Sequence, residues 1–250
     1  MNIERYLQRI NYSGSLEPRR EVLQQMQKAH LLAVPFENLD IHIGIPIELD
    51  VSRFYAKIVE NNRGGFCYEL NELFNDLLKS LGFNTKRISA RVYSKDLGYG
   101  QEFSHLALIV IIEKMEYLVD VGFGEFSFGP LELQIGEIQN DERGNFMIDY
   151  FDNTYLRVNK ITDGITTPEY IFENSERDLS EYQTLCTYHQ TDRNSHFTQK
   201  KLISKPTEHG RITISGNQLK TNTGTIFTES IIKNEAEFNE MLLNYFNMKI

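Results

Sequence analysis

Arg63-Gly64-Gly65-Phe66-Cys67-Tyr68-Glu69-Leu70-Asn71 is the stretch that decides the fold, because an amphipathic helix begins inside it at the cysteine. The residues that follow at the spacing of one helical face are Leu70, Phe74, Leu77, Leu78 and Leu81. Gly82 stands where a helix commonly ends. The free N–H groups of a helix start favour a thiolate, and Gly64 and Gly65 permit a tight turn with space for a substrate at the sulfur. Cys67 is therefore a candidate nucleophile, with a buried structural thiol as an equal alternative on this position alone.

Upstream of this stretch, apolar periodicity predicts short helices near residues 3–10 and 22–31, and a third helix with Ser52 as its N-cap. Downstream of Gly82, short runs of β-branched and aromatic residues predict an antiparallel β region, either a barrel or a strongly bent sheet. These runs are residues 88–93, 103–112, 117–123, 146–149 and 155–158.

The last third of the chain contains both helical and strand patterns. It is expected to hold a helix over 179–188, strands over 211–215, 218–221 and 225–231, and a final helix with Phe238, Leu242, Tyr245 and Phe246 on one face. No repeat or low-complexity linker divides the chain, so boundaries near 82 and 175 are soft and the three parts are expected to pack together.

Composition excludes several classes of protein. The formal charge of the 250 residues is −9 and no basic run is present, so we expect no nucleic-acid partner. The longest apolar stretch, 106–112, is far shorter than the roughly 20 residues of a transmembrane helix, so we expect no membrane span. The first ten residues are charged and do not predict a signal peptide, which favours a cytoplasmic location. Two cysteines are too few for a disulfide framework.

Thiol catalysis also needs a base beside the sulfur and a third group that orients the base. His105 precedes the apolar run 106–112, and Asp120 follows the apolar run 117–119. If the two strands are neighbours, the Asp120 carboxylate can hold the Nδ1–H of His105. Singly, the histidine fits a core or edge position and the aspartate fits a turn. The chain order cysteine, histidine, aspartate, which transglutaminase-like cysteine enzymes share, favours a triad.

Other candidate residues are weaker. Cys186 lies inside the predicted helix 179–188 and is expected to be a structural thiol. His189 and His196 flank a polar loop without further ligands at metal spacing, so we expect a solvated loop and no metal site. Residues 122–129 are rich in glycine but lack a dinucleotide or Walker motif, although their backbone amides could form a small anion nest.

Several blocks of this sequence resemble the arylamine N-acetyltransferase family. They are Arg9-Ile10-Asn11-Tyr12-Ser13-Gly14, Val34-Pro35-Phe36-Glu37-Asn38-Leu39-Asp40, the nonapeptide 63–71, Ser104-His105-Leu106 and Val119-Asp120-Val121-Gly122-Phe123-Gly124. The resemblance covers essentially the whole chain and is most specific at the nonapeptide. The family often has Tyr where this chain has Phe66, and no diagnostic motif follows residue 175.

The resemblance implies an α+β fold in three parts. These are an N-terminal helical bundle with the nucleophile (1–82), a central antiparallel β-barrel with the histidine and aspartate (83–175) and a C-terminal α/β lid (176–250). The first two parts form a cysteine-protease or transglutaminase-like core, with the catalytic residues Cys67, His105 and Asp120 between them.

The resemblance also implies the reaction. Acetyl-coenzyme A is the co-substrate, Cys67 accepts the acetyl group, and an aromatic amine or hydrazine then takes it, in a ping-pong mechanism associated with xenobiotic metabolism. Gly124 is the residue that approaches the coenzyme pyrophosphate. Three phenylalanines line the aromatic pocket by family position: Phe36, Phe123 and Phe197.

Two other interpretations stay open. A transglutaminase-like amidase or peptidase would use the same triad, with water in place of the amine as the acceptor of the acyl group. A binding protein that has kept the fold and lost catalysis is disfavoured, because all three triad residue types are present. The sequence makes no prediction of the oligomeric state.

Overall fold

Helices fill the first part of the chain, as the apolar periodicity predicts. In the computed structural model, which describes residues 1–250, they are α1 (Ile3–Arg9), α2 (Arg20–Ala33), α3 (Leu39–His42), α4 (Val51–Tyr55), the π-helical turn η1 (Ala56–Glu60) and α5 (Cys67–Ser80). The predicted N-cap Ser52 is wrong. Asp50 caps α4, because its carboxylate accepts the N–H groups of Ser52 at 2.7 Å and Arg53 at 3.1 Å.

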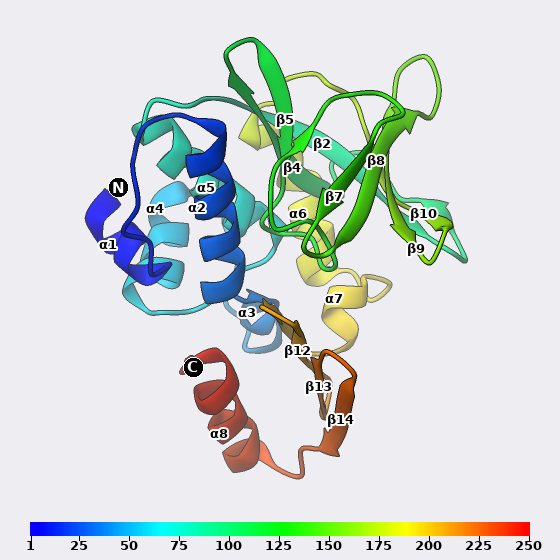
Figure 1. Ribbon diagram of the computed structural model, residues 1–250. Helices are drawn as coiled ribbons and strands as arrows, with labels where there is room; N and C mark the ends of the chain where they lie inside the picture. The colour runs from blue at the N-terminus through cyan, green and yellow to red at the C-terminus, as the bar shows by residue number, and fades with distance from the viewer.

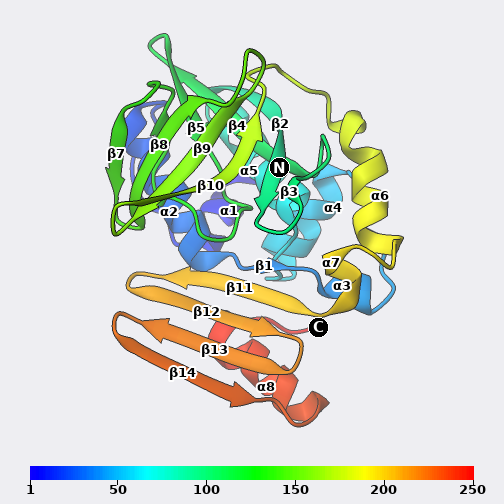
Figure 2. The same ribbon diagram turned by 90° about the vertical axis from the view of Figure 1, so that its right-hand side faces the viewer.

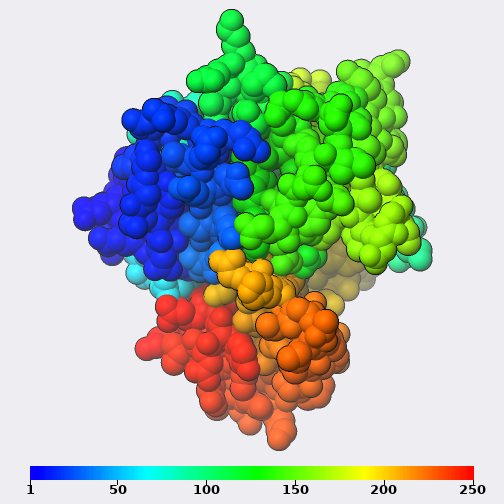
Figure 3. All heavy atoms as spheres, viewed as in Figure 1, coloured from blue at the N-terminus to red at the C-terminus, as the bar shows by residue number.

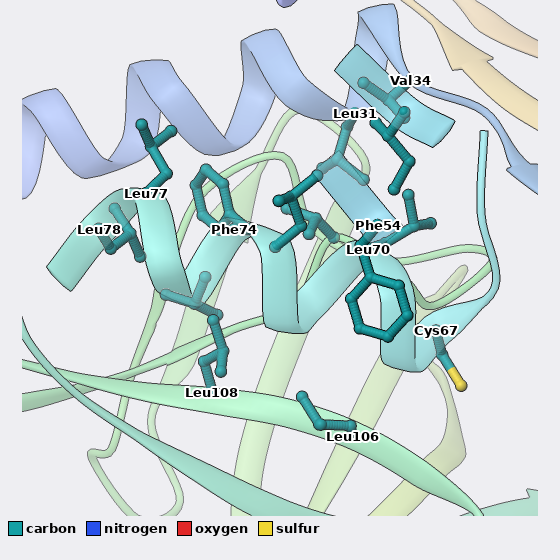
Figure 4. Packing of buried hydrophobic residues seen from close by; sticks show 14 of the residues in the cluster. Leu31, Val34, Phe54, Cys67, Leu70, Phe74, Leu77, Leu78, Leu106 and Leu108 are labelled. Carbon is teal, nitrogen blue, oxygen red and sulfur yellow. The ribbon is translucent and has the colours of Figure 1, made fainter. Parts of the chain in front are cut away.

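Helix α5 is the centre of the largest hydrophobic core. Eleven of its fourteen residues are buried, and its apolar face packs against α2, α4 and strand β4 (His105–Ile112), as Figure 4 shows. Gly82 lies just past its C-cap with a φ of 88°, the left-handed conformation that glycine adopts at little cost. The predicted helix therefore has the expected start and end.

The middle of the chain is one antiparallel sheet in the order β6-β5-β4-β2-β10-β9-β8-β7, with β3 paired to β2 (Figure 1). Besides β4, its strands are β2 (Asn84–Ser94), β3 (Gly98–Tyr99), β5 (Met115–Val119), β6 (Leu131–Glu132), β7 (Ile138–Asp141), β8 (Gly144–Tyr150), β9 (Leu156–Thr162) and β10 (Ile165–Phe172). Gln139 of β7 bonds both the N–H and the C=O of Glu132 in β6, each at 2.7 Å. This side chain links the two edge strands, so the sheet is a nearly closed barrel around its own apolar core.

The last part contains η2 (Leu179–Tyr182), α6 (Gln183–Thr191) and α7 (His196–Gln199), followed by a second sheet and α8 (Glu235–Phe246). That sheet has the order β1-β11-β12-β13-β14. Its strands are β1 (Phe36–Glu37), β11 (Leu202–Thr207), β12 (Gly210–Ser215), β13 (Gln218–Thr223) and β14 (Ile226–Ile231). Because β1 comes from the helical region, its backbone pairing with β11 joins that region to the C-terminal sheet.

Figures 2 and 3 show this sheet and α8 as a lobe beneath the helices and the barrel. The α+β class, with a helical part, an antiparallel barrel and a C-terminal sheet with its helix, is confirmed. None of the helices is both long and apolar enough to cross a membrane.

Candidate active site

Cys67 is the first residue of α5, and only 4% of its surface is exposed. Figure 4 shows its sulfur directed away from the apolar side chains of the helix. Glu69 accepts the backbone N–H of Phe66 at 3.0 Å and so caps this helix start. The N–H groups of Cys67 and Tyr68 belong to the first turn, where a helix offers no internal acceptor. The sulfur therefore lies beside donors that favour a negative charge.

His105 and Asp120 are brought together as expected, but through the other ring nitrogen. His105 begins β4 and Asp120 directly follows β5, the neighbouring antiparallel strand. Nε2 of His105 lies 2.6 Å from Oδ2 of Asp120, whereas the sequence argument predicted Nδ1. Nδ1 of the ring is therefore free of Asp120, and the Cys67 sulfur lies close enough to His105 to raise the pKa of its imidazole. All three side chains are almost fully buried.

The protonation of His105 is set by opposing effects. Burial favours the neutral ring, but the Asp120 carboxylate and then the Cys67 sulfur outweigh it and raise the pKa of His105 to about 10. The imidazole is therefore a cation at neutral pH. A cation beside the sulfur stabilises a thiolate.

Asn71, which was not among the predicted site residues, connects helix α5 to Asp120. Its Nδ2 donates to Oδ1 of Asp120 at 2.9 Å and to the C=O of Leu106 at 2.7 Å, and its Oδ1 accepts the N–H of Val121 at 2.9 Å. A spacing of four residues from Cys67 places it on the same helix face, and this spacing is the signal that could have identified it. Asp120 Oδ1 also accepts two backbone N–H groups of the following turn, from Gly122 and Phe123.

The glycines before the cysteine serve the protein interior rather than a substrate. A Cβ on Gly64 would meet the C=O of Pro35 and the side chain of Glu37. A Cβ on Gly65 would lie 3.0 Å from the Cβ of Glu69. The expectation that these glycines leave space at the sulfur is therefore wrong, because protein atoms already fill that space.

Two of the three predicted pocket phenylalanines lie together. The ring centroids of Phe36 and Phe197 are 5.9 Å apart, and both rings pack against Phe66, the residue before the nucleophile. Phe123 is elsewhere in the site. It packs edge-on against His105 at 5.4 Å and on the barrel residue Tyr170 at 5.3 Å. Aromatic side chains therefore lie on both the Cys67 and the His105 side of the triad.

The expectation that His189 lies in a solvated loop is wrong. It is on α6, its ring contacts Phe66 and Phe197, and neither buried ring nitrogen has a hydrogen-bond partner. Burial lowers the pKa of His189 to about 4, so the ring is neutral. The other flanking histidine, His196, is exposed. Cys186 is buried and its thiol contacts Gln190 at 3.2 Å, as expected for a structural cysteine.

Gly124 lies in an exposed turn where a Cβ would meet no atom within 4 Å. Its C=O accepts a hydrogen bond from Arg211 of β12. Arg211, Arg143 and Lys160 all pair with the carboxylate of Glu125, which follows Gly124. Three cations thus surround one carboxylate. Beside them is an open groove of about 530 Å³, which Arg143 and Arg211 line together with the carboxylates Glu125, Glu142 and Glu208. The sequence alone could not locate this positive charge, because its members are far apart in the chain.

No group of three or more His, Cys, Asp or Glu side chains is arranged to hold a metal ion. The chemistry that the residues themselves support is nucleophilic attack by a thiolate, with proton transfer through His105.

The chain is similar to known acetyltransferases in both sequence and structure. A family model described as N-acetyltransferase matches residues 20–250. The chain is 35% identical to the arylamine N-acetyltransferase pineal gland isozyme NAT-3 of Gallus gallus, over 84% of this chain and 79% of that protein. It is 32% identical to arylamine N-acetyltransferase 1 of Homo sapiens, over 100% of this chain and 95% of that protein. The structure of Mycobacterium marinum arylamine N-acetyltransferase in complex with CoA superimposes with a TM-score of 0.90 at 27% identity, covering 99% and 93% of the two chains. The protein is therefore an acetyltransferase and belongs to the arylamine N-acetyltransferase family.

Proposed function

We propose that the protein transfers an acetyl group from acetyl-coenzyme A to an aromatic amine or hydrazine through an acetyl-Cys67 intermediate. The observation that carries this proposal is the Nε2–Oδ2 contact of 2.6 Å between His105 and Asp120, with the Cys67 sulfur near enough to the ring to raise the pKa of His105. A thiolate and an imidazolium held in this way are a nucleophile and an acid ready for thioester exchange.

In the first half-reaction the Cys67 thiolate attacks the thioester carbonyl and the bond from that carbon to the coenzyme sulfur breaks. The coenzyme leaves as a thiol after taking the proton of His105. The N–H groups of the first turn of α5, above all that of Cys67, are the proposed donors to the tetrahedral oxyanion. Acetyl-Cys67 and a neutral His105 result.

In the second half-reaction the amine nitrogen attacks the acetyl carbon, His105 accepts the amine proton, and the carbon–sulfur bond breaks to restore the thiolate. Loss of the sulfur's charge on acetylation supports this order of events. Because Cys67 contributes to the raised pKa of His105, acetylation lowers that pKa and frees the ring to act as a base.

For the coenzyme we propose the groove that Arg143 and Arg211 line beside the Gly124 turn, with its phosphates held by these two arginines and by Lys160 and with Glu125 displaced. The supporting observations are the open space at Gly124 and the three cations that pair with the partly exposed carboxylate of Glu125. Phe36 and Phe197 are the proposed flat walls for the acceptor ring, with Phe123 on the His105 side. The division at residues 82 and 175, a cytoplasmic location and a role in xenobiotic metabolism stay predictions.

Intact mass after brief exposure to acetyl-coenzyme A, with peptide mapping and then addition of an arylamine, tests the reaction. We expect one acetyl group on Cys67 that the amine removes as its amide, and no label on Cys67→Ala. Discharge by water at the same rate with and without the amine would instead indicate an amidase. Arg211→Gln should raise KM for acetyl-coenzyme A and leave KM for the amine unchanged; equal changes in both would exclude the coenzyme site at Arg211.

A further inference from the structure

Five charged side chains lie buried behind the start of α5, in addition to the triad. The three carboxylates are Glu37, Asp40 and Glu69, and the two cations are Lys57 and Arg63. None of these side chains is more than 12% exposed. A cluster this buried is costly unless every charge is paired, so its geometry is tightly constrained.

Lys57 is the cation that Glu69 contacts. Its Nζ lies 2.9 Å from Oε2 of Glu69 and 2.7 Å from Oδ2 of Asp40, with Glu37 farther away at 3.7 Å. Arg63 pairs with Glu37 and Asp40, at 2.8 Å each. Lys57 therefore contacts all three carboxylates and Arg63 contacts two of them, so the ion pair of Glu69 depends on Lys57 alone.

Glu69 in turn fixes the backbone that leads into the nucleophile. Its Oε2 accepts the N–H of Phe66, the residue before Cys67, at 3.0 Å. A Cβ on Gly65 would come within 3.3 Å of the same oxygen, so the carboxylate packs directly under this turn. A shift of Glu69 would therefore move the Phe66–Cys67 backbone.

The backbone of Lys57 is itself unusual. It lies in the π-helical turn η1, which continues α4, and its C=O accepts the N–H of Arg63 at 3.1 Å. Wide helical turns are rare and occur often at functional sites, because they redirect side chains that a regular helix would place elsewhere. Here the turn directs Lys57 toward the carboxylates below Cys67.

We propose that Lys57 is a positioning residue for the nucleophile: it holds the Glu69 carboxylate under the start of α5 and offsets its negative charge, which favours the Cys67 thiolate. The inference rests on the proposed role of Cys67 in acetyl transfer. It adds a residue that touches neither substrate nor sulfur and acts through Glu69.

The charges around Glu69 and around the Cys67 sulfur show whether loss of Lys57 favours or disfavours the thiolate. Glu69 faces Lys57 of η1, Glu37 of β1 and Asp40 of α3, with Arg63 just behind, which leaves one excess negative charge. Without Lys57 the excess is two. The other titratable groups that face the Cys67 sulfur are His105, Tyr68 and Cys186. None of them changes with Lys57, so loss of this cation should disfavour the thiolate.

The test is the pH dependence of Cys67 alkylation by iodoacetamide, measured without any coenzyme. For Lys57→Met we expect the midpoint of the profile to move up by about half a pH unit or more, because loss of this buried cation leaves one more uncompensated negative charge behind the helix start. Lys57→Arg should keep the wild-type midpoint. The double variant Lys57→Met/Glu69→Gln, which removes one charge of each sign, should return toward it. Lys86→Met is the matched control, because it removes the partly buried Lys86–Glu116 ion pair of the barrel.

A folded Lys57→Met protein with the wild-type midpoint would overturn the proposal, as would a double variant whose midpoint equals that of the single variant. If Lys57→Met fails to fold, Glu69→Gln is the variant that tests the proposal. It keeps an oxygen for the Phe66 N–H and removes a negative charge, so its midpoint should move down, and an unchanged midpoint overturns the proposal. Because alkylation needs no coenzyme, failure of the proposed acetyl transfer would leave this result interpretable.

Discussion

Asn71 donates a hydrogen bond of 2.9 Å from Nδ2 to Oδ1 of Asp120, so the helix that begins at Cys67 also holds the acidic member of the proposed triad. The same amide bonds the C=O of Leu106 and the N–H of Val121. One side chain thus fixes β4 and the turn after β5 relative to α5. The position of Cys67 and the position of its partners are coupled by this contact.

We expect Asn71→Leu to lower kcat for acetyl transfer by about a hundred-fold, because misplacement of catalytic groups by an ångström has this effect. Asn75→Leu is the matched control. Asn75 is buried on the same helix but bonds Glu72 and Thr85. Both variants should lower Tm, and only Asn71→Leu should slow single-turnover acetylation. Equal rates for the two variants would remove Asn71 from the catalytic arrangement.

The raised pKa of His105 makes part of the stability depend on pH. Folding raises this pKa from about 6.5, the value of an unfolded histidine, to about 10. The contribution of the raised His105 pKa to the unfolding free energy is therefore complete below pH 6.5 and is lost as the pH rises toward 10. Denaturant unfolding of wild type and His105→Gln should show a difference in unfolding free energy that shrinks over this range. A difference that grows with pH would contradict a cationic His105.

Gly122 is where the turn after Asp120 approaches the nucleophile most closely. A Cβ there would lie 2.7 Å from Nδ2 of Asn71 and 2.8 Å from the Cα of Cys67. Gly122→Ala should therefore destabilise the fold by about 1–3 kcal/mol through overpacking and reduce kcat. Gly124→Ala is the control, because its Cβ meets nothing. It should leave Tm unchanged and, under the proposed coenzyme site, raise KM for acetyl-coenzyme A. Equal Tm values for the two variants would contradict this packing.

Both ring nitrogens of His189 are buried and have no hydrogen-bond partner. Replacing an unsatisfied buried polar group by an apolar one of similar size removes its desolvation penalty, so His189→Leu should raise the unfolding free energy by about 1 kcal/mol. The ring is neutral, so the charge at His105 is unchanged and acetylation by acetyl-coenzyme A should stay close to wild type. Thermal unfolding and single-turnover acetylation check both statements. A marked loss of stability would show that the ring nitrogens are satisfied.

Local sequence was sufficient for the longer helices and for the order of the candidate triad, but it missed the short helices α3 and α7. The apolar spacing after Cys67, with Gly82 at its end, depends on residues within one element, and the start and end of α5 follow from them. The alternating runs of the middle part were recognised for the same reason. Six strands were missed: β3, β6, β7 and β10 in the barrel, and β1 and β11 in the lower sheet. Short or exposed strands such as Ile138–Asp141 exist only because a neighbouring strand pairs with them.

The sequence by itself determined the family, the α+β class and the choice of Cys67, His105 and Asp120 as the proposed triad, because each is carried by contiguous motifs. Only the tertiary structure decided which nitrogen of His105 meets Asp120, since this depends on the relative position of two strands. It alone brought together Arg143, Lys160 and Arg211, and likewise Lys57 and Glu69 behind the nucleophile. Charges on separate elements interact through space, and their distances are set by packing that no local pattern encodes.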